Sequence, residues 1–226
     1  MKKGDSMSAA IIKMLGMGIL ETLYMTLFST LCAYIIGLPL GVILYVTSPG
    51  ALYENKPVNS ILGVIVNLLR SVPFIVLLIT ILPFTRLIVG TTIGSTATVV
   101  PLVVAAAPFV ARMVESSLKE IDGGIIEAAL SMGTSPMQII VKVLIPEAMP
   151  SMIVGSTIAV TTILGYSAMA GFTAGGGLGD IAIRYGYYRY DTKMMLITVV
   201  LLVIIVQVLQ EVGMKIAKKA DKRIRK

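Results

Sequence analysis

The sequence predicts an all-α membrane protein with five transmembrane helices. Hydrophobic residues make up 56% of the 226 residues, charged residues make up only 14%, and the mean hydropathy is +0.92. Soluble domains carry about 45–50% apolar and about 25% charged residues, so this composition excludes a soluble globular fold and a disordered chain. Apolar runs recur along the chain, and a basic segment follows the last of them.

A membrane-spanning helix needs about 20 mostly apolar residues. The stretches that meet this requirement lie at about 22–46, 61–84, 92–112, 152–172 and 194–212. The second stretch is the least regular, because Asn67 and Arg70 interrupt it. An arginine at the bilayer centre costs roughly 2.5–3.5 kcal/mol on insertion scales, so we expect Arg70 at a membrane face or against protein.

The distribution of Lys and Arg predicts the orientation of the spans. The net charge of +7 is concentrated in the last twelve residues, directly after an apolar run, where basic residues mark the cytoplasmic side. Five spans then place the N-terminus outside and the C-terminus in the cytoplasm. We expect a short extracytoplasmic segment at 1–16, a membrane domain at 17–213 with a cytoplasmic loop at 115–148, and a basic tail at 214–226. The charge therefore indicates topology, and no nucleic-acid partner is expected.

Residue types needed for catalysis are scarce. The chain has no histidine and one cysteine, Cys32, so we expect no disulfide within the chain, no metal site and no Ser/His or zinc-based enzyme. The glycine cluster at 175–179 lacks the Gly-Lys pair of a phosphate-binding loop and is interpreted as a turn. Glu21 and Glu211 lie near span ends, which argues against a proton relay inside the membrane.

The loop at 115–148 has the signals of two ordered helices. The run from 125 to 132 has a helix-like pattern, and Gly133 stands where a left-handed C-terminal residue is expected. Ser135-Pro136 with Gln138 forms a helix start with a capping box. The second helix is expected to end near residue 145, with a break or kink at Pro146. A rigid helix pair of this kind suits docking to another protein.

The spacing within this loop resembles the EAA loop of ABC importer permeases. The family pattern is EAA, three residues, G, nine residues, I, one residue, LP. The chain keeps the residues Glu127, Ala128, Ala129, Gly133 and Pro146, and departs from the pattern with Val143 and Ile145. The resemblance implies that the loop sits in a groove of a separate ATPase subunit, with Glu127 fixing that geometry through a hydrogen bond or an ion pair.

Two further regions narrow the resemblance. Residues 67–74 are similar to the "RSxPF" entry to the second span in amino-acid importer permeases. Residues 165–171 and 175–187 are similar to the region before the last span in methionine-type permeases of type I ABC importers. The resemblance covers about 17–213. It implies a homodimer in the bacterial cytoplasmic membrane, two ATPase subunits that use ATP and Mg, an external substrate-binding lipoprotein, and no cofactor in this subunit.

By this resemblance the chain is not an enzyme but a permease for D- or L-methionine. The alternatives are a permease for another small amino acid or organic solute, and a channel or carrier that works alone. The 14 methionines do not decide the substrate, since methionine commonly fills gaps in apolar packing.

Two groups of residues are candidates for transport functions. Tyr166, Ser167 and Met169 are candidates for the pathway or its gate, although plain helix packing also explains them. The basic and aromatic residues Arg184, Tyr187 and Arg189 are candidates for docking the binding protein, and an interfacial aromatic belt is the alternative. Small residues four apart, such as Gly37 and Gly41, favour close helix contacts either at a dimer seam or within one subunit.

Overall fold

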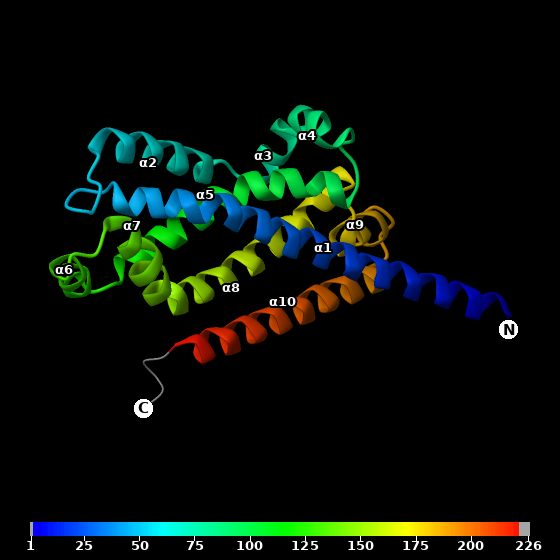
Figure 1. Ribbon diagram of the computed structural model, residues 1–226. Coiled ribbons are helices and arrows are strands. Elements are labelled where there is room, and N and C mark those ends of the chain that lie inside the picture. Colours follow the sequence, from blue (N-terminus) through cyan, green and yellow to red (C-terminus); the bar gives the residue numbers. More distant parts are fainter. Residues whose placement is uncertain (1, 222–226) are drawn as a thin grey trace. The chain divides into compact units, whose positions relative to one another are not determined.

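The computed structural model describes the backbone of residues 2–221 and the side chains of residues 9–221, and this part of the chain is helical with no strand. Four long helices are α1 (Lys2–Val46), α5 (Ser95–Lys119), α8 (Ile145–Met169) and α10 (Thr192–Ala220) (Figure 1). The chain divides into two compact units, and each long helix contributes a part to both. Unit 1 comprises Met1–Leu31, Val72–Ala105 and Val160–Leu209, and unit 2 comprises Cys32–Ser71, Ala106–Ala159 and Gln210–Lys226.

Four continuous segments are long and apolar enough to cross a membrane. They are Ala9–Val46, Ser95–Lys119, Pro136–Thr173 and Thr192–Ala220, and the broken pair α2 (Lys56–Ser71) with α3 (Phe74–Thr80) counts as a fifth if it is one span. The predicted all-α membrane fold is therefore confirmed. Its helices extend further than the predicted spans, since α1 begins at Lys2 and includes most of the predicted segment 1–16. The tail predicted at 214–226 is helical to Ala220, and residues 222–226 lie outside the described part.

The second predicted span, 61–84, is not one continuous helix. It ends at Ser71, resumes as α3 after Pro73, and continues as α4 (Leu82–Val89). Pro73 has an extended ψ of 134° and precedes the first residue of α3. Proline has no N–H to donate and disfavours helical backbone at the preceding residue, so the break is encoded locally. Arg70, expected at a membrane face or against protein, lies in the last turn of α2 and is exposed.

In unit 2, α1 packs closely on α5 through glycine. A Cβ atom added at Gly37 would lie 2.8 Å from the carbonyl oxygen of Ala107, and one at Gly41 would lie 2.5 Å from that of Ala111. Leu44, which follows on α1, forms a buried cluster with Ala111 and Val66 of α2. The small residues at 37 and 41 thus serve a contact within the subunit, one of the two roles that the sequence left open.

In unit 1, the short helix α9 (Gly177–Ile181) begins against α1. The Glu21 carboxylate accepts a hydrogen bond from the Gly177 N–H at 2.6 Å, and the Thr22 hydroxyl accepts one from the Leu178 N–H at 2.9 Å. These two side chains satisfy N–H groups that a helix start leaves unpaired. Gly176 and Gly177 have φ angles of +83° and +73°, so the glycine cluster forms the turn that the sequence predicts.

We expect Gly41→Ala to destabilise the protein by about 1–3 kcal/mol, because its methyl group would press on the α5 backbone. Gly16→Ala, on the same helix, meets nothing within 4 Å and is the matched control. It should be neutral or stabilising by up to about 1 kcal/mol, since alanine favours helix. Thermal unfolding midpoints of the detergent-solubilised protein test this, and equal midpoints for the two variants would contradict it.

Candidate functional site

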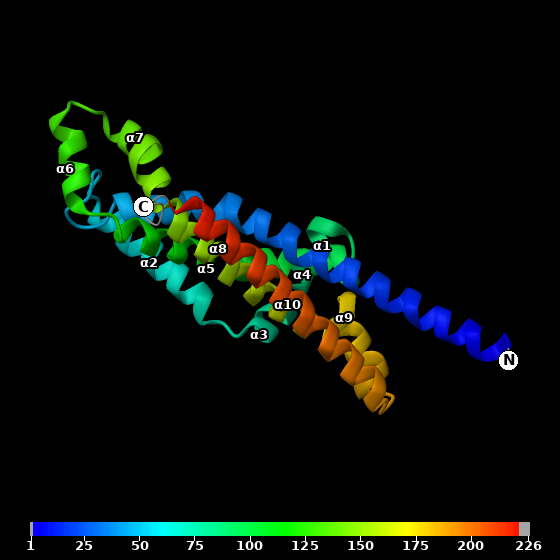
Figure 2. The same cartoon turned by 90° about the horizontal axis from the view of Figure 1, so that it is seen from below.

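The loop between α5 and α8 folds as a helical hairpin, built from α6 (Gly123–Ser131), α7 (Pro136–Ile139) and the π-helical turn η1 (Ile140–Leu144). We call residues 123–144 the α6–α7 hairpin. Asp122 caps α6 by accepting the Gly124 N–H at 2.7 Å. Gly133 follows α6 with a φ of +76°, and its N–H donates to the Leu130 carbonyl at 2.9 Å. The predicted pair of helices joined by a glycine turn is confirmed, and Figures 1 and 2 show α6 and α7 side by side.

The two helix starts differ in how well the sequence signals them. The Ser135 N–H donates to the Gln138 side chain at 3.3 Å, and the Ser135 side chain faces the Gln138 backbone N–H, so both halves of the predicted capping box are present. The Asp122 cap was not among the predicted signals, although an Asp directly before an apolar helical run is a start signal.

At Pro146, where a break or a kink was expected, the helix does not break. The helical chain is continuous from η1 into α8, and Pro146 is the second residue of α8. A proline there cannot donate to the carbonyl one turn earlier. The wider π-helical turn at 140–144 lies directly before it, at the point where an α-helical hydrogen bond would be missing.

The family-pattern residues lie mostly on the surface of the hairpin. Ala129 is buried, whereas Glu127, Ala128, Gly133 and Pro146 are exposed. Only one of the two alanines therefore serves close packing within this chain. The Glu127 carboxylate forms no hydrogen bond or ion pair with any residue in the described part of the chain. The hydrogen bond or ion pair predicted for Glu127 is therefore not made to this part of the chain, and its role stays a prediction.

Large apolar side chains are exposed along the same hairpin. They are Ile125 at 38%, Leu130 at 45%, Met132 at 78%, Met137 at 61% and Val141 at 55% exposure. We call these five residues the hairpin patch; the family pattern does not include them. Lipid can cover exposed apolar residues of a membrane-spanning helix, and Met137 and Val141 belong to the continuous segment Pro136–Thr173, which is long enough to cross a membrane. Helix α6, which carries or adjoins the other three residues of the patch, is too short to span one. Exposed apolar patches mark interaction sites, so the hairpin is a candidate docking surface for another protein.

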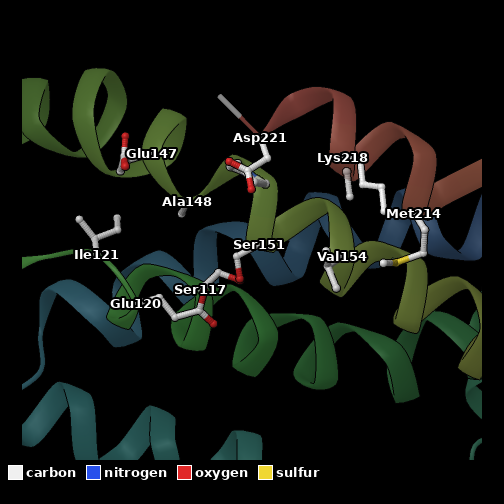
Figure 3. Close-up of a pocket in the computed structure, with 12 residues that line it drawn as sticks. Ser117, Glu120, Ile121, Glu147, Ala148, Ser151, Val154, Met214, Lys218 and Asp221 are labelled. Atoms are coloured by element: carbon white, nitrogen blue, oxygen red, sulfur yellow. The ribbon is translucent and has the colours of Figure 1, made fainter. Parts of the chain in front are cut away.

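A cavity of about 400 Å³ lies in unit 2 where α5, α8 and α10 come together at the ends of the hairpin (Figure 3). Ser117 of α5 and Ser151 of α8 point toward each other, and the Ser151 hydroxyl donates to Ser117 at 3.0 Å. Carboxylates of Glu120 and Glu147 also line the cavity, opposite Met214. Within residues 9–221 no group of three or more His, Cys, Asp or Glu side chains could hold a metal ion.

The candidate pathway residues do not share one face. Tyr166 stacks on Phe74 with ring centroids 4.5 Å apart, and Met169 is exposed. Ser167 is 1% exposed and donates to the Leu164 carbonyl at 2.7 Å, so it packs inside unit 1. Of the three, Met169 alone presents a largely accessible side chain.

The candidate docking residues for an external protein are all exposed and follow α9 in unit 1. Arg184 lies in the π-helical turn η3 (Ala182–Tyr187) and pairs with Asp180 at 2.8 Å. Burial raises the pKa of the Asp180 carboxyl, and Arg184 opposes that shift. Arg189 lies over the Tyr185 ring at 4.5 Å, and Tyr187 is exposed beside Tyr188. The segment therefore displays two cations held in place by their neighbours.

We expect Gly133→Val to loosen the hairpin, because a β-branched residue at positive φ is strained by about 1–2 kcal/mol or more. Gly133→Asn is the control, since asparagine tolerates this conformation. Amide hydrogen exchange of residues 123–139 should accelerate in the valine variant and stay close to wild type in the asparagine variant. Equal exchange in both variants would show that the turn does not hold the hairpin together.

Comparison with known proteins identifies the family. A family described as "Binding-protein-dependent transport system inner membrane component" matches residues 37–226. A protein of Vibrio cholerae named "Probable D-methionine transport system permease protein MetI" is 52% identical over 203 residues, covering 90% of each chain. The "D-methionine transport system permease protein MetI" of Escherichia coli is 52% identical over 165 residues, which is 73% of this chain and 76% of that protein.

Two solved structures share the fold. A chain from the structure described as inward-facing conformations of the MetNI methionine ABC transporter superposes with a TM-score of 0.93 at 48% identity, over 94% of this chain and 99% of that one. A chain described as an amino acid ABC transporter with histidines gives a TM-score of 0.73 at 19% identity, over 96% and 97%, and shares the fold alone. The chain belongs to the family of binding-protein-dependent transport system inner membrane components.

Proposed function

We propose that this chain is the membrane-spanning permease subunit of an ATP-driven importer for methionine. The observation that carries the proposal is the α6–α7 hairpin, which combines the EAA spacing with an exposed apolar patch. The names of its relatives support the substrate, since D-methionine and methionine transport appear in them. The importer has two copies of this chain, two ATPase subunits and an external substrate-binding lipoprotein. No covalent chemistry takes place in this chain.

The hairpin receives the motion of the ATPase subunits. Those subunits bind ATP and Mg, and the hairpin patch with Glu127 sits in a groove on their surface. The caps at Asp122 and Ser135 and the turn at Gly133 hold the hairpin as one body. When ATP closes the two ATPase subunits on each other, the hairpin moves with them and displaces the attached ends of α5 and α8. The pathway then switches from inward-facing to outward-facing, and the docked binding protein releases its ligand.

Orientation follows from the charge distribution and the docking surface together. The hairpin and the C-terminal tail face the cytoplasm, where ATP is available, and the N-terminus lies outside. The segment with Arg184, Tyr187 and Arg189 then faces the binding protein on the external side. Met169 lies on the pathway, since its side chain is accessible in unit 1.

We expect the double variant Met132→Asp with Met137→Asp to lose the ATPase subunits. The two side chains are exposed, so the protein should fold, but two carboxylates would oppose burial of the hairpin patch in a groove. Tyr53→Asp, at an exposed aromatic residue of the loop before α2, is the control and should retain the subunits. Copurification from a membrane that expresses the complete importer measures this. Full retention by the double variant would contradict docking through the patch.

In reconstituted vesicles, uptake of labelled methionine should need ATP inside and the binding protein outside. Glu127→Arg together with Gly133→Pro should abolish that uptake, because the pair of changes reverses the charge and removes the turn. Unlabelled D- and L-methionine should compete better than other amino acids. Uptake without ATP would instead indicate a carrier that works alone, and stronger competition by another amino acid would reassign the substrate.

A further inference from the structure

A single arginine joins α5 to α2 within unit 2. One terminal nitrogen of Arg112, Nη2, donates to the Gly63 carbonyl oxygen and to the Asn67 side-chain oxygen, each at 3.0 Å. The other, Nη1, donates to the Glu115 carboxylate at 2.6 Å. The planar guanidinium therefore bonds to its own helix through Nη1 and to α2 through Nη2. A lysine ammonium cannot reproduce this geometry.

The ion pair between Arg112 and Glu115 on α5 is mostly buried. The Glu115 side chain is 6% exposed, and it pairs with Arg112 and Lys119, each at 2.6 Å. The charge-assisted hydrogen bond from Arg112 to this buried carboxylate fixes the orientation of the guanidinium. The Arg112 side chain is itself 25% exposed, so water competes with these contacts only in part.

The hydrogen bonds from Arg112 to α2 give a role to Asn67, a polar residue within an apolar helix. Gly63 and Asn67 are one turn apart on the same face of α2, and both supply an acceptor to Arg112. A Cβ atom at Gly63 would lie 3.4 Å from Arg112 Nη2, an ordinary van der Waals contact, so the guanidinium packs directly over this residue. Asn67 is therefore the side-chain acceptor that completes a contact with α5.

The contact lies close to the hairpin. Arg112 is seven residues before the end of α5 at Lys119, which is about 10 Å along the helix. The α6–α7 hairpin begins after Asp122. Next to Arg112, Ala111 packs with Val66 of α2. A displacement of the hairpin thus reaches α2 through an apolar contact and, beside it, through directional hydrogen bonds.

We propose that Arg112 is a positioning residue that makes α2 move together with α5 when the hairpin is displaced. The proposal rests on the proposed function, because it concerns how the ATPase motion enters the spans. Without the hydrogen bonds from Arg112 to Gly63 and Asn67, α5 would follow the hairpin and slide past α2. ATP hydrolysis would then continue with fewer substrate molecules moved per ATP.

The test is the ratio of methionine transported to ATP hydrolysed, measured with the complete importer in vesicles. Asn67→Leu and Arg112→Lys should each lower this ratio about fivefold or more, the size of a typical coupling effect. Asn67→Asp keeps an acceptor oxygen for Arg112 and should retain most of the ratio. Asn59→Leu is the matched control. Asn59 is an asparagine of the same helix, but it ties α2 to α1 by donating to the Leu44 carbonyl at 2.7 Å.

The outcomes separate positioning from simple stabilisation. An unchanged ratio in Asn67→Leu and Arg112→Lys would overturn the inference, and so would an equal loss in Asn59→Leu. Failure of both Arg112→Lys and Asn67→Leu to assemble with the ATPase subunits would assign the contact a structural role and would also overturn it. A wild-type importer without ATP-driven methionine uptake would contradict the proposed function instead.

Discussion

Backbone N–H and C=O groups that lie in an apolar environment have to be paired inside the chain, because no water is available to satisfy them. Long helices meet this requirement by themselves, which is why they make up most of the described residues. Every interruption then needs a specific partner. The start of α9 is satisfied by Glu21 and Thr22 of α1. The turn before α9 is tied by the Thr98 hydroxyl, which donates to the Gly175 carbonyl at 3.1 Å.

The same constraint gives a use to polar side chains within apolar helices. Asn59 and Asn67 lie on one helix, yet each faces a different neighbour, α1 for the first and α5 for the second. Tyr34 of α1 likewise reaches α8, since its hydroxyl donates to the Met152 carbonyl at 3.4 Å. A hydrogen bond of this kind fixes the register of two helices, which apolar contacts leave adjustable. Polar ties therefore connect α2 to α1 and to α5, and α1 to α8, within unit 2.

Sequence patterns predict features that local signals encode. The hairpin is one of them, because Gly133 and Ser135-Pro136 carry their own conformational preferences. The break at Pro73 is equally local, but the apolar run on both sides of it predicted a single span. The contacts of Arg112 with α2 and of the α9 start with α1 could not be predicted. The residues that pair in them are 45 to 156 positions apart in the sequence. Ser167 was predicted as a pathway residue, but it is buried within unit 1. Its position in a helix did not show whether its side chain would be buried or accessible.

The docking role proposed for the hairpin requires it to be stiff and exposed at once, and its construction meets both demands with few buried residues. Ala129, Ile139, Ile140 and Leu144 are buried, while the hairpin patch stays accessible. Stiffness comes from capped helix ends and one left-handed glycine, not from a large core. A docking element of this kind can transmit force without specifying the substrate. Substrate choice and energy input can therefore reside in separate proteins, with the permease joining them through a small number of directional contacts such as those of Arg112.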